Sequence, residues 1–290
     1  MPRIFFEKYQ GNGNDFIIID SRKYDFYKDL LLNNINSHNL CNRNFGIGAD
    51  GIIFILKAVD NDNDVRMVIY NSDNSEAEMC GNGIRCLIKF LKDRTLDNNS
   101  KYEFRIETKA VLKFSTYQKG KITVNMGKPI FESHLIPTIM SEKIKDIPTK
   151  VFEIDKFNNR GYSCSMGNPH LIFFVDNLKD INLYEIGPLL EKNKFFPQKT
   201  NVHFCKILNS ENIEVLVWER GAGATLACGT GACAIHSVAF RLGYCGNKST
   251  IKLPGGTLDI EWGDKNDEVY MTGDAKKVFS GEYSLSLIHI

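Results

Sequence analysis

Residues 65–86 read VRMVIYNSDNSEAEMCGNGIRC, and residues 213–234 read IEVLVWERGAGATLACGTGACA. The two stretches align without a gap, and each begins with a run of β-branched and aromatic residues typical of a strand. Each continues through mostly polar or small residues to Cys-Gly-x-Gly and an apolar stretch of helical character. The pattern predicts one strand–loop–helix unit that occurs twice, with Cys80 and Cys228 at equivalent positions.

A second pair of similar stretches supports this repeat. GNDFIII (13–19) and GNPHLIF (167–173) each show a Gly-Asn turn that leads into an apolar strand. Each precedes its cysteine by a similar distance, 66 residues from Asn14 to Cys80 and 60 from Asn168 to Cys228. Chance similarity is the alternative, and the gapless alignment makes it the weaker explanation. We therefore expect two related halves.

The fold class follows from the balance of strand and helix signals. Further strand patterns occur at ITVNM (122–126), VFEI (151–154), LDIEW (258–262) and VYMTG (269–273), and few long helical patterns compete with them. We predict an α+β fold of two pseudo-symmetric domains, each a mainly antiparallel sheet wrapped around one central helix. The first domain comprises residues 1–127, which residues 275–290 are expected to rejoin, and the second comprises residues 128–274.

Composition narrows the possible functions. The formal net charge is +1 without a basic stripe or an acidic tail, which disfavours nucleic acid and membrane surfaces as partners. The longest apolar runs, such as IIFIL (52–56) and LIFFV (171–175), have the length of strands and are too short to span a bilayer. Eight cysteines without a visible secretory signal predict reduced thiols and a cytoplasmic protein.

The spacing of the cysteines gives little support to a metal site or a redox pair. Structural zinc sites usually have two cysteine pairs with two to four residues between the members of each pair. C-x-x-C is absent, and His170, His203 and His236 are scattered along the sequence. We expect no metal, although a cysteine-based metal-binding or redox protein remains the alternative from another functional class. Six cysteines are expected to be buried as small apolar residues: Cys41, Cys86, Cys164, Cys205, Cys233 and Cys245.

Cys80 and Cys228 differ from these six because each precedes a predicted helix. Unpaired N–H groups and the helix dipole favour negative charge there, so we expect a lowered thiol pKa and a turn able to bind an anion. Two such thiols can invert a stereocentre beside a carboxylate, since one removes the Cα proton and the other delivers a proton from the opposite face. This chemistry needs no electron-sink cofactor. Dinucleotide and P-loop fingerprints are absent, and NFGIGADG (44–51) is interpreted as a tight loop.

The motifs together closely resemble the diaminopimelate epimerase family, nearly from end to end. The motifs that carry the resemblance are GNGNDFIIID (11–20), NFGIGADG (44–51), YNSDNSEAEMCGNGIRC (70–86), VNMGKP (124–129), SMGNPH (165–170), IGPLLE (186–191), FPQKTN (196–201), ERGAGATLACGTGACA (219–234), LPGG (253–256) and YMTG (270–273). The resemblance implies cofactor-independent interconversion of LL- and meso-diaminopimelate in lysine and peptidoglycan-precursor biosynthesis, at a site in the cleft between two domains. It also implies a homodimer with Tyr270 near the contact.

The resemblance further assigns roles residue by residue. Cys80 and Cys228 match the acid and base, and His170 and Glu219 match groups that tune the thiols. The positions that match substrate-binding residues are Asn14, Asn71, Asn168, Asn201, Glu219 and Arg220 for the distal amino-acid end, and Gly81-Asn82 and Gly229-Thr230 for the reacting carboxylate. Uncharged amides, one acid and one arginine suit a substrate that carries charge at both ends.

A few positions depart from the family pattern. Asn12 replaces an apolar residue, Gly51 stands where a substrate-contacting glutamine can occur, Ala224 and Leu226 replace polar residues, and Thr230 replaces serine. The change at position 51 puts a side-chain contact there in doubt. A proline or hydroxyproline racemase is the nearest alternative function. Its substrate has one amino-acid end, whereas the Glu219-Arg220 pair and the asparagines indicate a second polar end.

Overall fold

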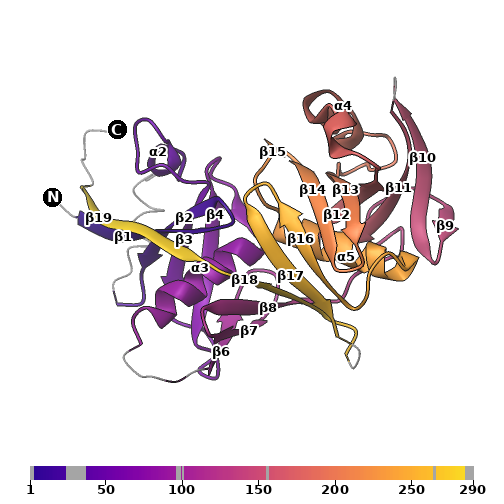
Figure 1. Cartoon of the computed structure of the whole chain (residues 1–290). Helices are drawn as coiled ribbons and strands as arrows, with labels where there is room; N and C mark the ends of the chain where they lie inside the picture. Colours follow the sequence, from indigo (N-terminus) through magenta and orange to yellow (C-terminus); the bar gives the residue numbers. More distant parts are fainter. Residues whose placement is uncertain are drawn as a thin grey trace. The chain divides into compact units, whose positions relative to one another are not determined.

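The computed structural model describes residues 3–23, 37–95, 99, 101–154, 157–263 and 266–284. The chain divides into two compact units, Met1–Val124 with Gly273–Ile290, and Asn125–Thr272 (Figure 1). Strands dominate both units and helices are few, which confirms the predicted α+β class. The last residues of the segment predicted to rejoin the first half, 285–290, lie outside the described part of the chain.

The first unit is a mixed sheet around one helix. Its elements are β1 (Arg3–Gly11), β2 (Asn14–Asp20), α2 (Ser37–Cys41), β3 (Gly51–Leu56), β4 (Val65–Asn71), β5 (Glu76–Ala77), α3 (Gly81–Lys92), β6 (Lys101–Glu107), β7 (Lys113–Gln118), β8 (Lys121–Gly127, across the unit boundary) and β19 (Lys276–Ser284). β19, β1 and β2 pair antiparallel, β2 pairs parallel with β3, and β3 pairs antiparallel with β4. β4 then pairs parallel with β6, and β6 to β8 form an antiparallel meander.

The sequence of α3 explains why it is the central helix of this unit. Its buried residues include Ile84, Leu87, Ile88 and Phe90, which lie on one broad apolar face, whereas Lys89 and Lys92 on the opposite side are partly exposed. A helix with such a face is stable where that face packs against other elements. Strands β1, β2, β3, β7 and β19 all contact α3 and provide this packing.

One charged side chain lies inside this apolar packing. Arg85 of α3 is fully buried, and its guanidinium donates from Nη2 to Asn12 Oδ1 (2.8 Å) and from Nε to the carbonyl oxygen of Asp274 (3.2 Å). Asn12 has a left-handed backbone conformation (φ 57°), which asparagine tolerates better than most residues. The departure from the family pattern at position 12 therefore has a structural reason, because the amide accepts from Arg85 and suits the turn before Asn14.

The second unit repeats this arrangement. Its elements are β9 (Glu142–Ile144), β10 (Ile147–Ile154), β11 (Phe157–Ser165), β12 (Pro169–Phe174), η1 (Leu178–Asp180), α4 (Leu183–Glu191), β13 (Asn201–Asn209), β14 (Asn212–Glu219), β15 (Gly223–Ala224), α5 (Gly229–Leu242), β16 (Lys248–Leu253), β17 (Gly256–Trp262) and β18 (Val269–Gly273). β12 pairs parallel with β13, β13 antiparallel with β14, and β14 parallel with β16. These pairings match those of β2, β3, β4 and β6, and strands β11, β12, β13, β16 and β17 surround α5.

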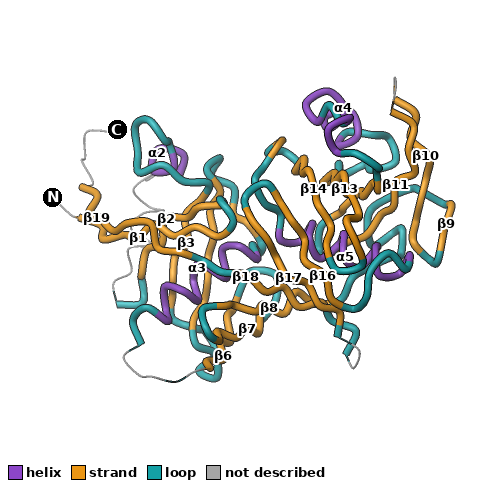
Figure 2. Tube along the Cα trace, viewed as in Figure 1, coloured by secondary structure: helices purple, strands orange, loops and turns teal. Residues whose placement is uncertain are grey.

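Both central helices begin directly after the loop that carries their cysteine (Figure 2). Helix α4 is an element that the sequence patterns did not predict, because Gly187 and Pro188 interrupt its apolar periodicity. Gly187 is required there, since a Cβ atom would lie 2.6 Å from Cδ2 of Trp218. No helix within the described residues is long and apolar enough to cross a membrane.

Candidate active site

Cys80 is the N-cap residue of α3, as predicted. Its backbone is extended (φ −141°, ψ 116°), and its Sγ accepts a hydrogen bond from the N–H group of Gly83 (3.4 Å). At the N-cap position the sulfur lies beside the unpaired backbone N–H groups of the first helical turn, which begins with Gly81 and Asn82. Cys80 as a residue is half-buried.

Two predicted substrate-binding residues lie beside Cys80. Asn14 Oδ1 accepts from the Cys80 thiol (3.8 Å) and from Asn82 Nδ2 (3.2 Å). Asn82 is buried, and its Oδ1 has no hydrogen-bond partner among the described residues. A buried amide oxygen without a partner is costly, so this atom is a candidate to accept a hydrogen bond from a bound molecule.

Asp50 orients this group, and the sequence analysis did not identify it. Its carboxylate accepts from Asn14 Nδ2 (2.8 Å), from the N–H group of Asp15 (3.0 Å) and from Arg43 (2.9 Å). Burial alone would raise the pKa of Asp15, but hydrogen bonds from Arg43 and Lys8 hold it below its usual value. In the sequence, the glycine-rich stretch NFGIGADG (44–51) indicates this part of the site, because it contains Asp50, which accepts a hydrogen bond from the side-chain amide of Asn14.

Asn71 and Gly51 face each other at the ends of β4 and β3. Asn71 donates from Nδ2 to Ser75 Oγ (2.9 Å) and is exposed. A Cβ atom at Gly51 would lie 2.7 Å from the carbonyl oxygen of Tyr70, so this backbone has no room for a side chain at position 51. A glutamine contact from that position therefore does not fit this chain.

Cys228 is the N-cap residue of α5, and its surroundings differ from those of Cys80. Only 3% of the residue is exposed, and its Sγ lies 3.6 Å from Thr230 Oγ1. Burial, followed by the neighbouring Glu219 carboxylate, raises the pKa of the Cys228 thiol well above its usual value. This is the opposite of the lowered pKa expected from the helix position, because removing a thiolate from water outweighs the helix dipole.

Two buried histidines adjoin Cys228. His170 in β12 and His203 in β13 are fully buried, and His170 Nδ1 lies 2.9 Å from His203 Nε2. Burial lowers the pKa of His203 to about 3, and burial together with the charges of His203 and Arg220 lowers the pKa of His170 well below its usual value. Both rings are therefore neutral at neutral pH. The histidines are scattered in the sequence, but adjacent parallel strands bring these two together.

The hydrogen bonds define how the protons are arranged along these rings. Asn168 Oδ1 lies 2.9 Å from His170 Nε2, and an amide oxygen can only accept, so His170 carries its proton on Nε2. His170 Nδ1 then accepts from His203 Nε2. The remaining ring nitrogen, His203 Nδ1, is buried and has no partner among the described residues. His203 is a second residue that the sequence analysis did not place in the site.

Three of the predicted distal-end residues lie close together in the second unit: Asn201 begins β13, Glu219 ends β14, and Arg220 follows β14. Asn201 donates from Nδ2 to the carbonyl oxygen of Pro169 (2.8 Å), and its Oδ1 accepts from the N–H group of Arg220 (3.0 Å). Glu219 accepts from Thr225 Oγ1 (2.6 Å). Tyr270 in β18 is engaged elsewhere, since its hydroxyl lies 2.7 Å from Asn266 Nδ2 and 3.2 Å from Glu268 Oε2.

The second glycine of each Cys-Gly-x-Gly motif has a different neighbour in the two units. A Cβ atom at Gly231 would lie 2.4 Å from Cε1 and 2.8 Å from Nε2 of His203, and 3.1 Å from Cys228 Sγ. At Gly83 the nearest atom is the methyl Cδ1 of Ile53, at 3.2 Å. Glycine at 231 thus provides the space that the histidine ring and the sulfur share.

This difference predicts unequal effects of the same substitution. Gly231→Ala should lower the free energy of unfolding by about 1–3 kcal/mol, because the histidine ring must shift within a packed core. Gly83→Ala should have little effect, since the end of a flexible isoleucine can move and alanine favours a helix by about 1 kcal/mol over glycine. Urea denaturation of both variants measures the difference, and equal stabilities would contradict this account.

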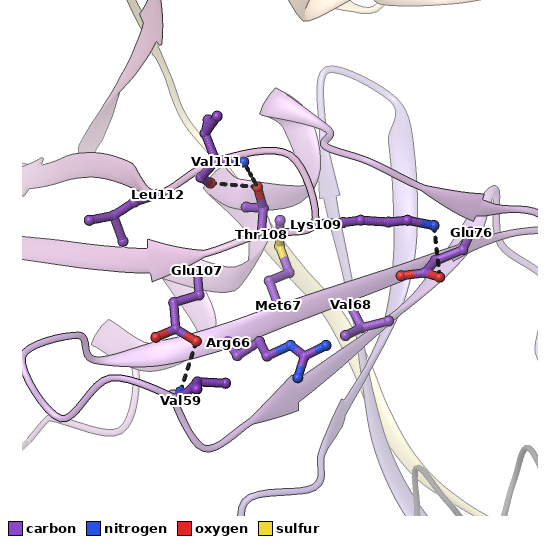
Figure 3. A pocket seen from close by; sticks show the side chains of 10 residues that line it. All are labelled: Val59, Arg66, Met67, Val68, Glu76, Glu107, Thr108, Lys109, Val111 and Leu112. Carbon is purple, nitrogen blue, oxygen red and sulfur yellow. Dashed lines mark hydrogen bonds and ion pairs between the residues drawn. The ribbon is translucent and has the colours of Figure 1, made fainter.

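A separate pocket of about 550 Å³ lies on the first unit (Figure 3). It is lined by Val59, Arg66, Met67, Val68, Glu76, Glu107, Thr108, Lys109, Val111 and Leu112. Glu76 pairs with Lys109 (3.1 Å), and Glu107 accepts from the N–H group of Val59 (2.8 Å). No residue of the predicted site lines this pocket, so it is not assigned to the reaction.

Comparison with known proteins identifies the family. The family model described as diaminopimelate epimerase matches residues 6–132 and 162–278, which include both cysteines. The chain belongs to the diaminopimelate epimerase family. A diaminopimelate epimerase of Prochlorococcus marinus (strain NATL2A) is 50% identical over 283 residues, which cover 97% of this chain and 99% of the relative. One from Synechocystis sp. is 46% identical over 282 residues, or 96% and 98% of the two chains.

Solved structures support the epimerase-family fold at much lower identity. A hydroxyproline epimerase from Agrobacterium vitis has a TM-score of 0.69 at 12% identity, with 97% of this chain and 92% of that chain covered. A phenazine biosynthesis protein of the PhzF family from Bacillus anthracis has a TM-score of 0.64 at 16% identity, with 98% and 100% covered. At these identities the likeness concerns the fold alone, which proteins with other names therefore share.

Proposed function

We propose that this chain interconverts LL- and meso-2,6-diaminopimelate with Cys80 and Cys228 as the two acid–base groups. The observation that carries the proposal is the equivalent placement of the two thiols. Each is the N-cap of a central helix and precedes a glycine-opened first turn, in a chain of the diaminopimelate epimerase family. One cysteine, as thiolate, takes the Cα proton, and the other, as thiol, delivers a proton to the opposite face.

The first turns of the two helices are assigned to the reacting carboxylate. The N–H groups of Gly81-Asn82 and of Gly229-Thr230 have no acceptor within their own helix, because they belong to its first turn. Donors fixed in this way stabilise the negative charge that spreads onto the carboxylate when the Cα proton leaves. The protein can thus hold the carbanion-like state with its own backbone, and we propose that no cofactor is required.

The polar side chains around the thiols are assigned to orientation and selectivity. The distal amino-acid end of the substrate would receive hydrogen bonds from four asparagines, Asn14, Asn71, Asn168 and Asn201. Glu219 would face the ammonium group of that end, and Arg220 would face its carboxylate. Asp50 and Asn82 fix Asn14, which supports a preformed arrangement. A substrate without a second polar end would leave such groups unpaired, so proline should be a poor substrate. His170 and Glu219 adjoin Cys228 and are assigned to setting its protonation.

The cellular context is proposed from family membership. We assign the chain to lysine and peptidoglycan-precursor biosynthesis in the cytoplasm, and we expect a homodimer with Tyr270 near the contact. The partly exposed side chain of Tyr270 is compatible with this expectation. Sedimentation of the purified chain measures the oligomeric state directly.

The direct experiment is an epimerase assay in deuterated water. LL-diaminopimelate, supplied without added cofactor, should yield meso product that carries deuterium at Cα. The recovered substrate should acquire the label more slowly, because the proton donor on the opposite face differs from the base that removed the proton. Proline serves as the control substrate. Equal early labelling of substrate and product would indicate a single base, and faster turnover of proline would instead support the racemase alternative.

A further inference from the structure

The buried cluster of Cys228, His170 and His203 has the composition of a metal site. One ligand atom from each residue, a thiol sulfur and two imidazole nitrogens, lies within 4.8 Å of the others. We propose that these three residues bind Zn²⁺ or a similar borderline-soft divalent cation, and that the bound cation reversibly blocks epimerisation by occupying the Cys228 sulfur. The metal is thus an inhibitor of the proposed reaction and takes no part in it.

The geometry of His170 fits the role of ligand. Imidazoles that bind a metal usually donate their second ring N–H group to an oxygen, which fixes the ring. His170 already donates from Nε2 to Asn168 Oδ1 (2.9 Å). Its Nδ1 lone pair is directed at His203 Nε2, 2.9 Å away, and zinc–nitrogen bonds of about 2.0–2.1 Å require only a modest separation of the two rings.

The sulfur lies at the same edge of the His203 ring. A Cβ atom at Gly231 would lie 2.8 Å from His203 Nε2 and 3.1 Å from Cys228 Sγ, so both ligand atoms border the same space. A side chain at this position would separate the two ligand atoms. The glycine therefore leaves the nitrogen and the sulfur facing a shared space, and three protein ligands would leave the fourth tetrahedral position of zinc for water or a carboxylate.

Proton movements balance the binding step. The cation forms a bond to the Cys228 sulfur as the S–H bond breaks, and that proton is released to solvent. His203 moves its proton from Nε2 to Nδ1, which frees the Nε2 lone pair for the metal. His203 Nδ1 has no hydrogen-bond partner within the described structure, so the change of tautomer breaks no bond at that atom. The single hydrogen bond between the rings is exchanged for two metal–nitrogen bonds.

The equivalent position in the first unit cannot form this site. When Asn14 is aligned with Asn168, the strand registers place Phe16 at the position of His170 and Ile53 at the position of His203. Ile53 is also the nearest neighbour of a Cβ at Gly83, as His203 is at Gly231. Cys80 therefore lacks both imidazole ligands. The proposed cation site belongs to Cys228 alone, and the repeat provides an internal control.

Cobalt binding gives a direct readout that does not depend on activity. Co²⁺ replaces Zn²⁺ in such sites, and a cobalt–thiolate bond produces a charge-transfer band in the near ultraviolet. The metal-free wild-type chain and Cys80→Ala should each bind one Co²⁺ with this band, whereas Cys228→Ala should show no band. Loss of the band in Cys80→Ala, or its persistence in Cys228→Ala, would overturn the assignment.

A substitution at His203 tests the imidazole ligands. His203→Ile introduces the residue that the first unit carries and should weaken Zn²⁺ binding at least 10-fold, as measured by competition with a chromophoric chelator. The matched control is His236→Asn, a buried histidine of α5 whose Nδ1 contacts Ser249 Oγ (2.7 Å), and it should leave the affinity unchanged. Circular dichroism verifies folding, and His203→Gln replaces the first variant if that one does not fold. Unchanged affinity in a folded His203 variant would contradict the proposal.

The inhibitory effect is tested separately. Zn²⁺ should abolish turnover of diaminopimelate by the wild-type chain, and a chelator should restore it. Cobalt binding by Cys80→Ala is measured without catalysis. If the chain proved not to epimerise diaminopimelate, the cobalt spectrum would still show whether Cys228 binds a metal. Conversely, an active epimerase that binds no Co²⁺ through Cys228 would refute only the metal site. Turnover that is insensitive to bound Zn²⁺ would show that the cation does not occupy the Cys228 sulfur.

Discussion

Replacing either Cys80 or Cys228 with alanine is expected to lower epimerisation of diaminopimelate about 10⁴-fold. Alanine has no group that can accept or donate the Cα proton, and each face of the substrate requires its own acid or base. Rates of interconversion of LL- and meso-diaminopimelate, measured for each single variant, test this expectation. A variant with turnover within about 10-fold of the wild type would contradict the two-base mechanism.

Cysteines from the same helices provide the controls. Cys86 in α3 and Cys233 in α5 are fully buried, so Cys86→Ala and Cys233→Ala remove a thiol from the core rather than from the first turn. Each should lower the free energy of unfolding by about 1 kcal/mol while activity stays close to that of the wild type. Folding of all four variants is verified by circular dichroism. Equal losses of activity in all four would show that packing, and not proton transfer, is responsible.

Replacing Arg85 with methionine is expected to have the largest effect on stability. The buried guanidinium donates to Asn12 Oδ1 and to the carbonyl oxygen of Asp274, and methionine cannot replace either hydrogen bond. A buried acceptor that loses its donor costs about 1–3 kcal/mol, so Arg85→Met should lower the free energy of unfolding by about 2–4 kcal/mol. Denaturation in urea measures this change. Catalysis should also weaken, because the turn at Asn12 leads directly to Asn14.

The same substitution at an exposed arginine is the control for Arg85. Arg66 lies in β4 with its side chain exposed, and Arg66→Met should change the free energy of unfolding by no more than about 0.5 kcal/mol. The comparison separates the loss of buried hydrogen bonds from the general effect of replacing a charge with a thioether. If the two variants were equally stable, the buried hydrogen bonds of Arg85 would contribute nothing to folding.

Local patterns in the sequence were sufficient for the elements that surround each thiol. Runs of β-branched and aromatic residues predicted β4 and β14, and Cys-Gly-x-Gly predicted the starts of α3 and α5. These features depend on residues close together in the chain, so the sequence shows them directly. Helix α4 was missed because Gly187 and Pro188 disrupt the periodicity, while the contact of Gly187 with Trp218 that stabilises it is non-local.

The electrostatic character of the two thiols required the tertiary structure. The sequence places Cys80 and Cys228 at equivalent helix starts, and that position alone predicts a lowered pKa for both. Burial and Glu219 instead raise the pKa of Cys228, since desolvation depends on everything packed around the sulfur. The repeat correctly relates the two positions in the chain, but it does not describe what surrounds them.

The sequence by itself determined the α+β class, the internal repeat, the two helix-capping cysteines and the resemblance to an epimerase family. Only the tertiary structure brought His203 beside His170 and Cys228, Asp50 to Asn14, and Arg85 to Asn12. The reason is physical. A strand or a helix start is specified by neighbours along the chain, whereas parallel strand pairing and burial join residues that the sequence keeps tens of positions apart.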